Sequence, residues 1–514
     1  MLEALSAHLP VLPILLPLLF GAVALMFERR GIGLQRAIGW TGLAALLLAV
    51  MALVARADTG AITFYLLGDW PARLGIALVA DRLSAGLVLT TALLAAACLL
   101  YAGAGWDRRA RHFHGLFQLQ LAGLNGAFLT GDLFNLFVFF EVMLIASYGL
   151  LLSGGRGPRM RAGLHYVVFN ITASTLFLIA LGLLYGLLGS LNMAEMGARV
   201  AALAPGDVAL VRAASGLLLV VFCAKAALLP LYLWLPNAYA RAPAAVAALF
   251  AIMTKVGVYS VLRVYTLVFG DGPGELAGWA WPWLFWTGLL TLLLATLGAL
   301  AASTLRMLVA YLVIASAATL FVAFALGTPA TIGAGLYYLM HSTFVTAGLF
   351  LVMDLIRGQR GRAGDALDYA GPLRRNAPLG VLFGIGAVSV AGLPPLSGFI
   401  GKALLLDAVP DGYRWWVWGA VLLTSLLTLV ALARTGSQVF WRAEPWPEEV
   451  RPPSPPLRAQ WAGAGLLLAY GIALTLWGTP VVRYAQAAAQ QLLEPAAYMQ
   501  AARQRTPQIR EPSP

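Results

Sequence analysis

The stretch VVFCAKAALLPLYLWLPNAYARAPAAVAALFAIMTKVGVYSVLR, residues Val220–Arg263, places two lysines in apolar surroundings with prolines between them. These are Lys225 and Lys255, and the third and last lysine of the chain, Lys402, also lies in an apolar run. Arginine stays charged in any protein environment, whereas a buried lysine can lose its proton near neutral pH. An ionisable group inside a membrane segment indicates a functional site. We therefore interpret the three lysines as sites that bind and release protons.

The composition indicates a membrane protein whose spans are all helical. Of 514 residues, 61% are hydrophobic and 11% are charged, and the mean hydropathy is +0.82. A soluble chain carries roughly 25% charged residues. Apolar runs of about 20 residues, the length of a spanning helix, recur from one end to the other. The net charge of +12 lies mainly in short loops, where the positive-inside rule places it. The chain is therefore expected to lie in the lipid bilayer, with no nucleic-acid partner.

Length and flanking charge predict about fourteen spans. The seventh is expected over Val208–Leu235, the eighth over Ala244–Phe269 and the fourteenth over Gln460–Trp477. Arginines concentrate in the loops after odd-numbered spans, so these loops are expected in the cytoplasm and both termini on the outer side. An acid precedes the first apolar run and bases follow it, which favours a first span over a cleaved signal. The proline-rich segment Trp441–Leu457 is expected to be a cytoplasmic linker, and Tyr484–Arg505 an amphipathic helix at the membrane surface.

Motifs for other chemistry are absent from the sequence. It contains no GxxxxGK[ST] loop, no CxxC spacing and no HExxH. Cys98 and Cys223 both lie in apolar runs and are expected to be small core residues. We therefore expect no catalytic residue, no metal and no cofactor, and an energy source outside this chain.

One acid lies deep in a predicted span. Glu141 is about eight residues into the span that contains GDLFNLFVFFEVMLIASYGLLL, or roughly 12 Å at 1.5 Å per residue. An unpaired carboxylate at that depth costs at least about 2.5 kcal/mol. Lys225 is a suitable partner, because an ion pair favours both charged forms and its rupture favours proton release from the lysine. The alternative is a pair that only holds helices together, although buried pairs are poor stabilisers. Asp354, by contrast, lies near a span end and is expected to pair with Arg357.

Four more ionisable residues are candidates, and for three of them an alternative role stays open. Lys255 is about eleven residues into its span, and the alternative of reaching the membrane surface is difficult from the centre. His341, in GLYYLMHSTFVTAGLFLVMD, suits a proton relay or is a hydrogen-bonded core residue. Lys402 follows GLPPLSGFIG, where prolines and glycines free backbone carbonyls and admit water. His165 opens the sixth span and either takes up protons from the cytoplasm or serves capping and packing.

Two spans are alike in kind. The seventh contains Lys225 and then Pro230, and the twelfth contains Pro394 and Pro395 and then Lys402. The twelfth span comes five spans after the seventh, and this odd step means that the two cross the membrane in opposite directions, as two inverted units with broken helices would. The order of lysine and proline differs between the two spans, and this departs from a simple repeat.

Four strings resemble a known family. TGDLFNLFVFFEVMLIASY, KAALLPLYLWLPNAYARAPAAVAALFAIMTKVGVY, YYLMHS and VAGLPPLSGFIGK are similar to the antiporter-like membrane subunits of respiratory complex I and of the Mrp antiporters. They look closest to the D-type subunit of the multi-subunit Mrp (Mnh, Pha) monovalent cation/proton antiporters. The likeness covers roughly Phe113–Arg434.

The resemblance implies about fourteen spans, two inverted five-helix units, and broken seventh and twelfth helices. The chain then divides into three N-terminal spans (residues 1–112), a first unit (113–270), a second inverted unit (281–436), and a linker, last span and tail (437–514). The family also works only in a complex of several different membrane subunits.

The resemblance further implies a proton path. In that path Glu141 pairs with Lys225, and Lys255 is the central residue that binds and releases the proton. His341 links Lys255 to Lys402, which is the last residue of the path. The complex I pattern usually has an acid after WLP, where this chain has an asparagine at position 237. This difference weighs against a complex I subunit.

Three functions remain in view. The first is the proton-translocating D-type subunit of a Na⁺ or K⁺/H⁺ antiporter in a bacterial inner membrane, working with other membrane subunits. The second is the related pump subunit of complex I or of a membrane-bound hydrogenase. The third is a scaffold that keeps the buried pairs for assembly alone. No carboxylate cluster of the kind expected at a Na⁺ site is visible, so the cation and its path stay open.

Overall fold

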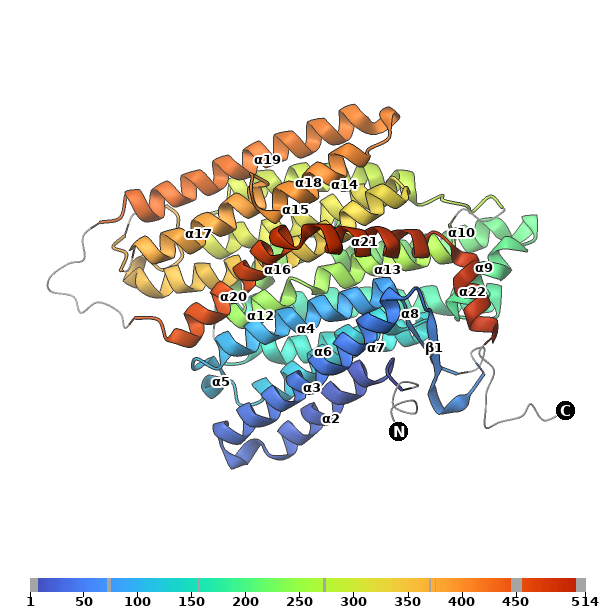
Figure 1. Cartoon of the computed structure of the whole chain (residues 1–514), viewed down its shortest axis with the longest axis horizontal. Helices are drawn as coiled ribbons and strands as arrows, with labels where there is room; N and C mark the ends of the chain where they lie inside the picture. Colours follow the sequence, from blue (N-terminus) through green and yellow to red (C-terminus); the bar gives the residue numbers. More distant parts are fainter. Residues whose placement is uncertain are drawn as a thin grey trace.

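The computed structural model describes residues 8–71, 75–155, 157–270, 274–368, 371–374, 376–444 and 455–504. Its long helices lie side by side along one axis and form a single bundle (Figure 1). The helices are α2 (Leu12–Met26), α3 (Ile32–Asp58), α4 (Arg82–Ala102), α5 (Trp106–Arg109), α6 (Phe113–Leu129), α7 (Leu133–Leu152), α8 (Pro158–Leu188), α9 (Met193–Ala201), α10 (Val208–Ala226), α11 (Trp234–Arg241), α12 (Ala244–Phe250), α13 (Met253–Leu267), α14 (Trp281–Leu300), α15 (Leu305–Ala325), α16 (Pro329–Gln359), α17 (Asn376–Ala391), α18 (Ser397–Ala408), α19 (Arg414–Gly436), α20 (Arg458–Leu476), α21 (Gly478–Leu492) and α22 (Pro495–Gln504). The strands are β1 (Thr63–Leu66) and β2 (Ala77–Ala80).

The structure confirms a multi-pass, mostly helical membrane protein. In the described ranges, 11 helical segments are long and apolar enough to cross a bilayer, and α2 and α17 are shorter apolar helices. The count of about fourteen spans stays a prediction. One feature departs from the all-helical expectation, because β1 and β2 pair antiparallel with Thr63 opposite Ala80. This hairpin lies near α22, at one end of the bundle (Figure 1).

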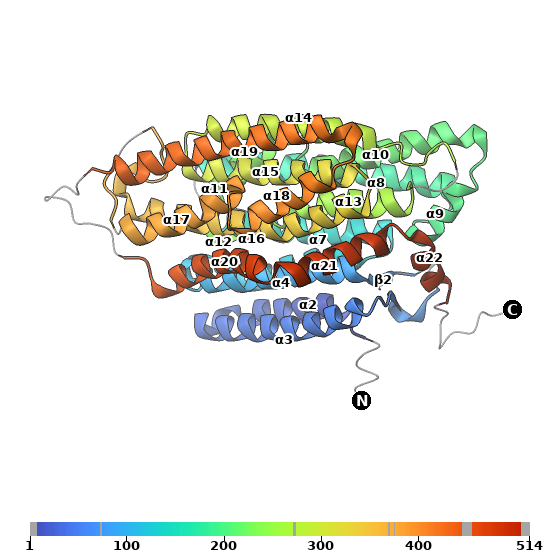
Figure 2. The same ribbon diagram turned by 45° about the horizontal axis from the view of Figure 1, so that its top comes forward.

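Arginines gather at the opposite end of the bundle, which we call the basic end. Arg109 of α5, Arg159 at the start of α8, Arg306 at the start of α15 and Arg357 near the end of α16 line one cavity there. The hairpin, α9 and α22 lie at the other end (Figure 2). The positive-inside rule places the basic end in the cytoplasm, and that orientation stays a prediction.

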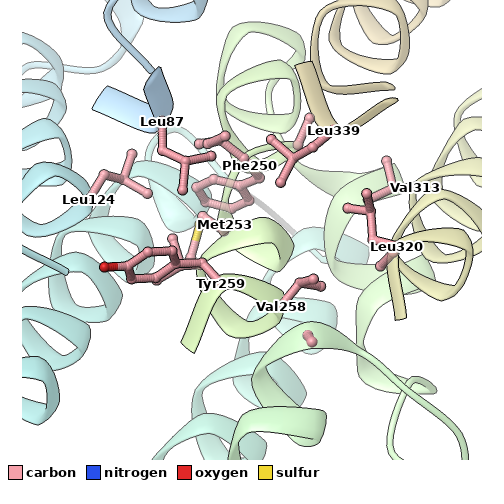
Figure 3. Packing of buried hydrophobic residues seen from close by; sticks show 14 of the residues in the cluster. Leu87, Leu124, Phe250, Met253, Val258, Tyr259, Val313, Leu320 and Leu339 are labelled. Atoms are coloured by element: carbon pink, nitrogen blue, oxygen red, sulfur yellow. The ribbon is translucent and has the colours of Figure 1, made fainter. Parts of the chain in front are cut away.

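The centre of the bundle is formed by α12 and α13. Every residue of both helices is buried, and the segment Ala244–Leu267 is more completely enclosed than any other candidate span of the described chain. Phe250 and Met253 lie among Leu87 of α4, Leu124 of α6 and other apolar side chains (Figure 3). Since Lys255 belongs to α13, its side chain starts from the most enclosed part of the chain.

Two spans are interrupted at the prolines singled out by the sequence. Pro230 lies in the non-helical segment between α10 and α11, and Pro394 and Pro395 lie between α17 and α18. Proline lacks an N–H and clashes with the preceding turn, so the helix cannot continue through it. Ala227 (φ 59°) and Gly392 (φ 79°) take the left-handed conformation where α10 and α17 end. The eighth span is also interrupted, between α12 and α13, which the sequence does not predict.

The prediction that Tyr484–Arg505 lies at the membrane surface is wrong for its first part, which belongs to α21. This helix follows α20 directly and packs against α16 and α4, with Ala485, Ala488, Ala489 and Leu492 buried. It is amphipathic, as expected, but its apolar face meets protein because small side chains let helices approach closely. Most of the proline-rich linker Trp441–Leu457 and the last residues of the tail lie outside the described residues.

A buried ion pair ties α13 to the hairpin end of α4. Arg263 Nη1 lies 2.6 Å from Asp81 Oδ2, and both side chains are 4% exposed. Asp81 also caps α4 by accepting a hydrogen bond from the N–H of Ser84 at 2.8 Å. Burial raises the pKa of Asp81, but the charge and hydrogen bonds of Arg263 outweigh burial and leave that pKa below its usual range.

We expect Arg263→Ala to lower the free energy of unfolding by about 3–5 kcal/mol, because it leaves the Asp81 carboxylate buried without its counter-charge. The measurement is thermal denaturation of the purified complex, followed by tryptophan fluorescence. Arg212→Ala is the matched control, since the Arg212 side chain is exposed and donates to the Glu275 carbonyl with no ion pair in the described chain. Equal losses in the two variants would contradict the expectation.

Candidate functional site: a row of buried ionisable side chains

Lys225 and Glu141 are connected through Ser174 of α8. Lys225, in the last turn of α10, is 5% exposed, and its Nζ donates to Ser174 Oγ at 2.9 Å and to the Asn170 carbonyl at 3.3 Å. Ser174 Oγ in turn donates to Glu141 Oε1. Both charged residues are described, and no direct ion pair joins them. The predicted pair is instead a hydrogen-bonded chain through a hydroxyl, which can donate and accept at once.

Lys255 is fully buried on α13. Its side chain has 0% exposure, and its Nζ donates to Ser316 Oγ of α15 at 2.7 Å. Ser316 Oγ donates to the Val313 carbonyl at 2.7 Å. Within the described ranges no carboxylate pairs with Lys255. An ammonium group has three N–H donors, so one hydroxyl acceptor leaves two of them without a protein partner among the described residues.

His341 lies on α16, next to the break between α17 and α18. It is 1% exposed, and its Nδ1 shares a hydrogen bond with Ser397 Oγ at 2.8 Å. The ring of Tyr338 lies 5.6 Å from the imidazole, and the Tyr338 side chain bonds that of Thr319 on α15. Thr319 and Ser316 lie three residues apart on one helix face. These hydroxyls lie in the region of Lys255 and His341, but Ser316 and Thr319 each donate to a carbonyl of α15 and are not bonded to each other in the described chain.

Lys402 lies at the break itself. Its Nζ donates to the last two carbonyls of α17, at 3.0 and 3.1 Å, and to Ser425 Oγ of α19 at 2.9 Å. The break leaves those carbonyls without helical N–H partners, so they are free to accept. Both Lys255 and Lys402 act electrostatically on His341, although neither is hydrogen-bonded to it in the described chain.

The step from Lys225 to Lys255 contains no direct hydrogen bond among the described residues. The two helices are in close contact, because a Cβ on Gly257 would lie 2.6 Å from the backbone nitrogen of Ala226. The hydroxyl of Thr254 is buried without a protein partner in the described part of the chain. A buried hydroxyl of this kind is a place for an ordered water, and we expect water to bridge this step.

His165 lies at the basic end, apart from the buried row. It is exposed in the second turn of α8 and lines a cavity of about 680 Å³ with Arg161, Asn237 and Arg241. The next residue, Tyr166, is buried and shares a hydrogen bond with Ser147 Oγ at 2.8 Å. His165 is therefore accessible to water, as an uptake site requires, and that role stays a prediction.

The predicted boundary pair is present. Arg357 Nε lies 3.2 Å from Asp354 Oδ1 at the basic end. The hydroxyl of Tyr101 donates to the other carboxylate oxygen at 3.0 Å. Asp354 is thus neutralised locally and does not join the buried row.

Each buried base of the row has a serine partner that sequence reasoning missed. These serines are Ser174, Ser316, Ser397 and Ser425. Hydroxyl residues are common in spanning helices, where they bond a carbonyl three or four residues earlier. Nothing in the sequence separates these four from the others, because the pairing joins residues of different helices. Among the described residues no group of His, Cys, Asp or Glu could hold a metal ion.

Buried titratable bases at interrupted helices place this chain among polytopic membrane transport proteins. Residues 130–428 match the profile of the family described as NADH:quinone oxidoreductase/Mrp antiporter, TM, and the chain belongs to that family. It is similar to the D-type subunit of the probable K(+)/H(+) antiporter of Rhizobium meliloti (strain 1021), with 40% identity over 95% of this chain and 96% of that protein. It is also similar to the D-type subunit of the Na(+)/H(+) antiporter of Bacillus subtilis (strain 168), with 37% identity over 96% and 98%.

Solved structures agree with this assignment. A chain in the structure of the Mrp complex from Dietzia sp. DQ12-45-1b superposes with a TM-score of 0.88 and 29% identity, over 97% of this chain and 99% of that one. A chain of respiratory complex I from Thermus thermophilus with bound NADH gives a TM-score of 0.74 and 27% identity, over 94% and 99%. The resemblance found in the sequence is thereby confirmed.

The close contact between α18 and His341 of α16 can be tested by enlarging the residue that makes it. A Cβ on Gly398 would clash with the Ser389 carbonyl and lie 2.9 Å from His341 Nε2. We expect Gly398→Ala to displace α18 and to lower exchange at least about tenfold, since overpacking costs about 1–3 kcal/mol or more. The measurement is cation-driven ΔpH in membrane vesicles, with the amount of assembled complex determined in parallel.

Gly384→Ala is the matched control for this variant. Gly384 lies on α17, and a Cβ there meets no atom within 4 Å. Wild-type exchange in Gly398→Ala would show that α18 can move away from the Ser389 carbonyl and His341 without loss of function.

Proposed function

We propose that this chain is the proton-translocating D-type subunit of a multi-subunit antiporter, which exchanges Na⁺ or K⁺ for protons across a bacterial inner membrane. Two relatives that match nearly the whole chain carry that subunit name, and a chain of an Mrp complex shares the fold. The observation that carries the proposal is a row of bases that are each hydrogen-bonded to a serine; Lys225, Lys255 and His341 are buried, and Lys402 is partly buried.

In this proposal the proton moves between bases that lie on neighbouring helices. Lys225 receives it near Glu141, whose carboxylate attracts a charged ammonium group. Lys255 is the central station, and His341 links it to Lys402 at the second helix break. The chain is a transporter component and not a redox enzyme, so the proton gradient supplies the energy.

Other membrane subunits complete the antiporter in this proposal. The cation path lies in a partner subunit, because the described residues offer no cluster of carboxylates in the membrane interior. Both termini lie on the outer side and the basic end faces the cytoplasm. His165, exposed at that end, takes up protons.

The second candidate is the pump subunit of complex I or of a membrane-bound hydrogenase. The shared fold with the Thermus thermophilus chain favours it, and Asn237 after WLP weighs against it. The neighbouring genes separate the two, since small antiporter subunits or flavin and iron–sulfur subunits would lie beside this one.

Glu141→Ala and Lys225→Ala test transport against a scaffold role. We expect each variant to keep the assembled complex and to lose exchange at least about tenfold, because each removes one end of the chain through Ser174. The measurement is dye-monitored ΔpH in everted vesicles after addition of NaCl or KCl, with assembly followed by native electrophoresis. Loss of assembly with unchanged exchange per complex would favour the scaffold.

A further inference from the structure

A cavity of about 210 Å³ lies at the basic end, outside the row of buried bases. It is lined by α5, by the ends of α4, α8, α15, α16 and α20, by the start of α12 and by the segment that joins α11 to α12. Four arginines line it, Arg109, Arg159, Arg306 and Arg357, and among the lining residues only Asp354 carries a negative charge. The lining of the cavity therefore carries an excess of positive charge.

Two of the arginines have carboxylate partners. Arg306 Nε donates to Asp365 Oδ2 at 2.8 Å, and Arg357 Nε lies 3.2 Å from Asp354 Oδ1. Each contact engages one edge of a guanidinium group that has five N–H donors. Donors on both side chains are therefore left for a ligand in the cavity.

Arg159 differs because no carboxylate pairs with it in the described part of the chain. Its Nε donates to the Arg241 carbonyl at 2.8 Å, its Nη1 donates to the Ser153 carbonyl at 3.1 Å, and its guanidinium lies 5.3 Å from the centre of the Trp106 ring. These contacts hold the group in place without neutralising it. The charges of Arg306 and Arg357 repel that of Arg159, and the carboxylate of Asp354 attracts it without forming an ion pair with it.

The formal charges around the cavity sum to +2, from four arginines, Asp354 and its neighbour Asp365. We propose that the cavity binds a phosphate group, held by Arg159 together with Arg109, Arg306 and Arg357. The planar guanidinium fork matches phosphate oxygens in bidentate fashion, and a phosphate can carry the two negative charges that the cavity lacks. At about 30 Å³ per water molecule the volume equals about seven waters, enough for a phosphate group and part of its hydration shell.

The phosphate has two sources with the same chemistry. One is the headgroup of an anionic phospholipid, which lies at the level where spanning helices end. The other is a small phosphate anion from solution. This proposal does not depend on the proton relay, because no residue of the cavity belongs to the buried row.

The experiment uses the purified complex that contains the full chain. One arm measures phosphatidylglycerol retained by native mass spectrometry after transfer into phosphatidylcholine nanodiscs with or without that lipid. The other arm measures the melting temperature against added inorganic phosphate at constant ionic strength. The variants are Arg159→Gln and Arg109→Gln; Arg109 is exposed on the short helix α5, so the second variant leaves the fold intact. The matched control is Arg161→Gln, which lies on α8 near Arg159 but lines the neighbouring cavity.

We expect both variants to weaken phosphate-group binding at least about tenfold and the control to retain it, since a hydrogen bond to a charged group is lost. Retention of phosphatidylglycerol without a response to inorganic phosphate identifies a lipid headgroup, and the converse identifies a free anion. The proposal is overturned if the wild-type complex binds neither probe. It is also overturned if binding is the same in all three variants, because the phosphate group then binds elsewhere on the complex.

Discussion

Lys255→Ala is expected to abolish cation-driven proton movement, with a loss of at least about a hundredfold, the usual contribution of an essential proton-transferring group. The lysine is fully buried, and Ser316 is the hydrogen-bond partner of its Nζ. The neighbouring hydroxyls of Ser316, Thr319 and Tyr338 keep their protons near neutral pH, so they cannot replace a base that accepts and holds one. The measurement is dye-monitored ΔpH in everted vesicles, per assembled complex.

Lys255→Arg separates titration from charge. Arginine keeps the positive charge but does not release its proton in a protein, so we expect this variant to be as inactive as Lys255→Ala. Ser260→Ala is the control on the same helix, since Ser260 is buried and bonds the Val256 carbonyl at 2.8 Å. Activity in Lys255→Arg would mean that only a fixed charge is needed at this position, and the relay would then be wrong.

The fold class and the ionisable members of the site could be predicted because charge is rare in apolar runs. Glu141, Lys255 and Lys402 stand out in a chain with only 11% charged residues, and a charge in hydrocarbon is too costly to be incidental. The prolines mark two interruptions for an equally local reason, the missing N–H. These signals need no knowledge of which helices touch.

The serine partners could not be predicted, because their role arises from contacts between helices. Ser316 is one of many hydroxyl residues in the spans, and only the packing of α15 against α13 brings it to Lys255. The packing of α21 against α16 and α4 could not be predicted for a similar reason. An amphipathic helix has the same sequence pattern whether its apolar face meets lipid or α16.

Ser174 carries the second large expected effect, because it is the link between the two charges that open the row. Its hydroxyl accepts from Lys225 Nζ at 2.9 Å and donates to Glu141 Oε1. An alanine here leaves the ammonium with the Asn170 carbonyl at 3.3 Å as its one hydrogen-bond partner among the described residues. We expect Ser174→Ala to lower exchange about tenfold, equivalent to the roughly 1.5 kcal/mol of a hydrogen bond to a charged group.

Two further variants show whether this effect comes from the hydroxyl. Ser174→Thr keeps the hydroxyl and is expected to restore most of the exchange. Thr175→Ala is the neighbouring control, since Thr175 is exposed and bonds the Ile171 carbonyl of its own helix at 3.0 Å. If Ser174 acts through the two charges, Ser174→Ala also shifts the pH at which exchange is half-maximal, which a purely structural loss would not do. An unchanged pH profile with a lowered amount of complex would make Ser174 a packing residue, and Glu141 would then act on Lys225 through space alone.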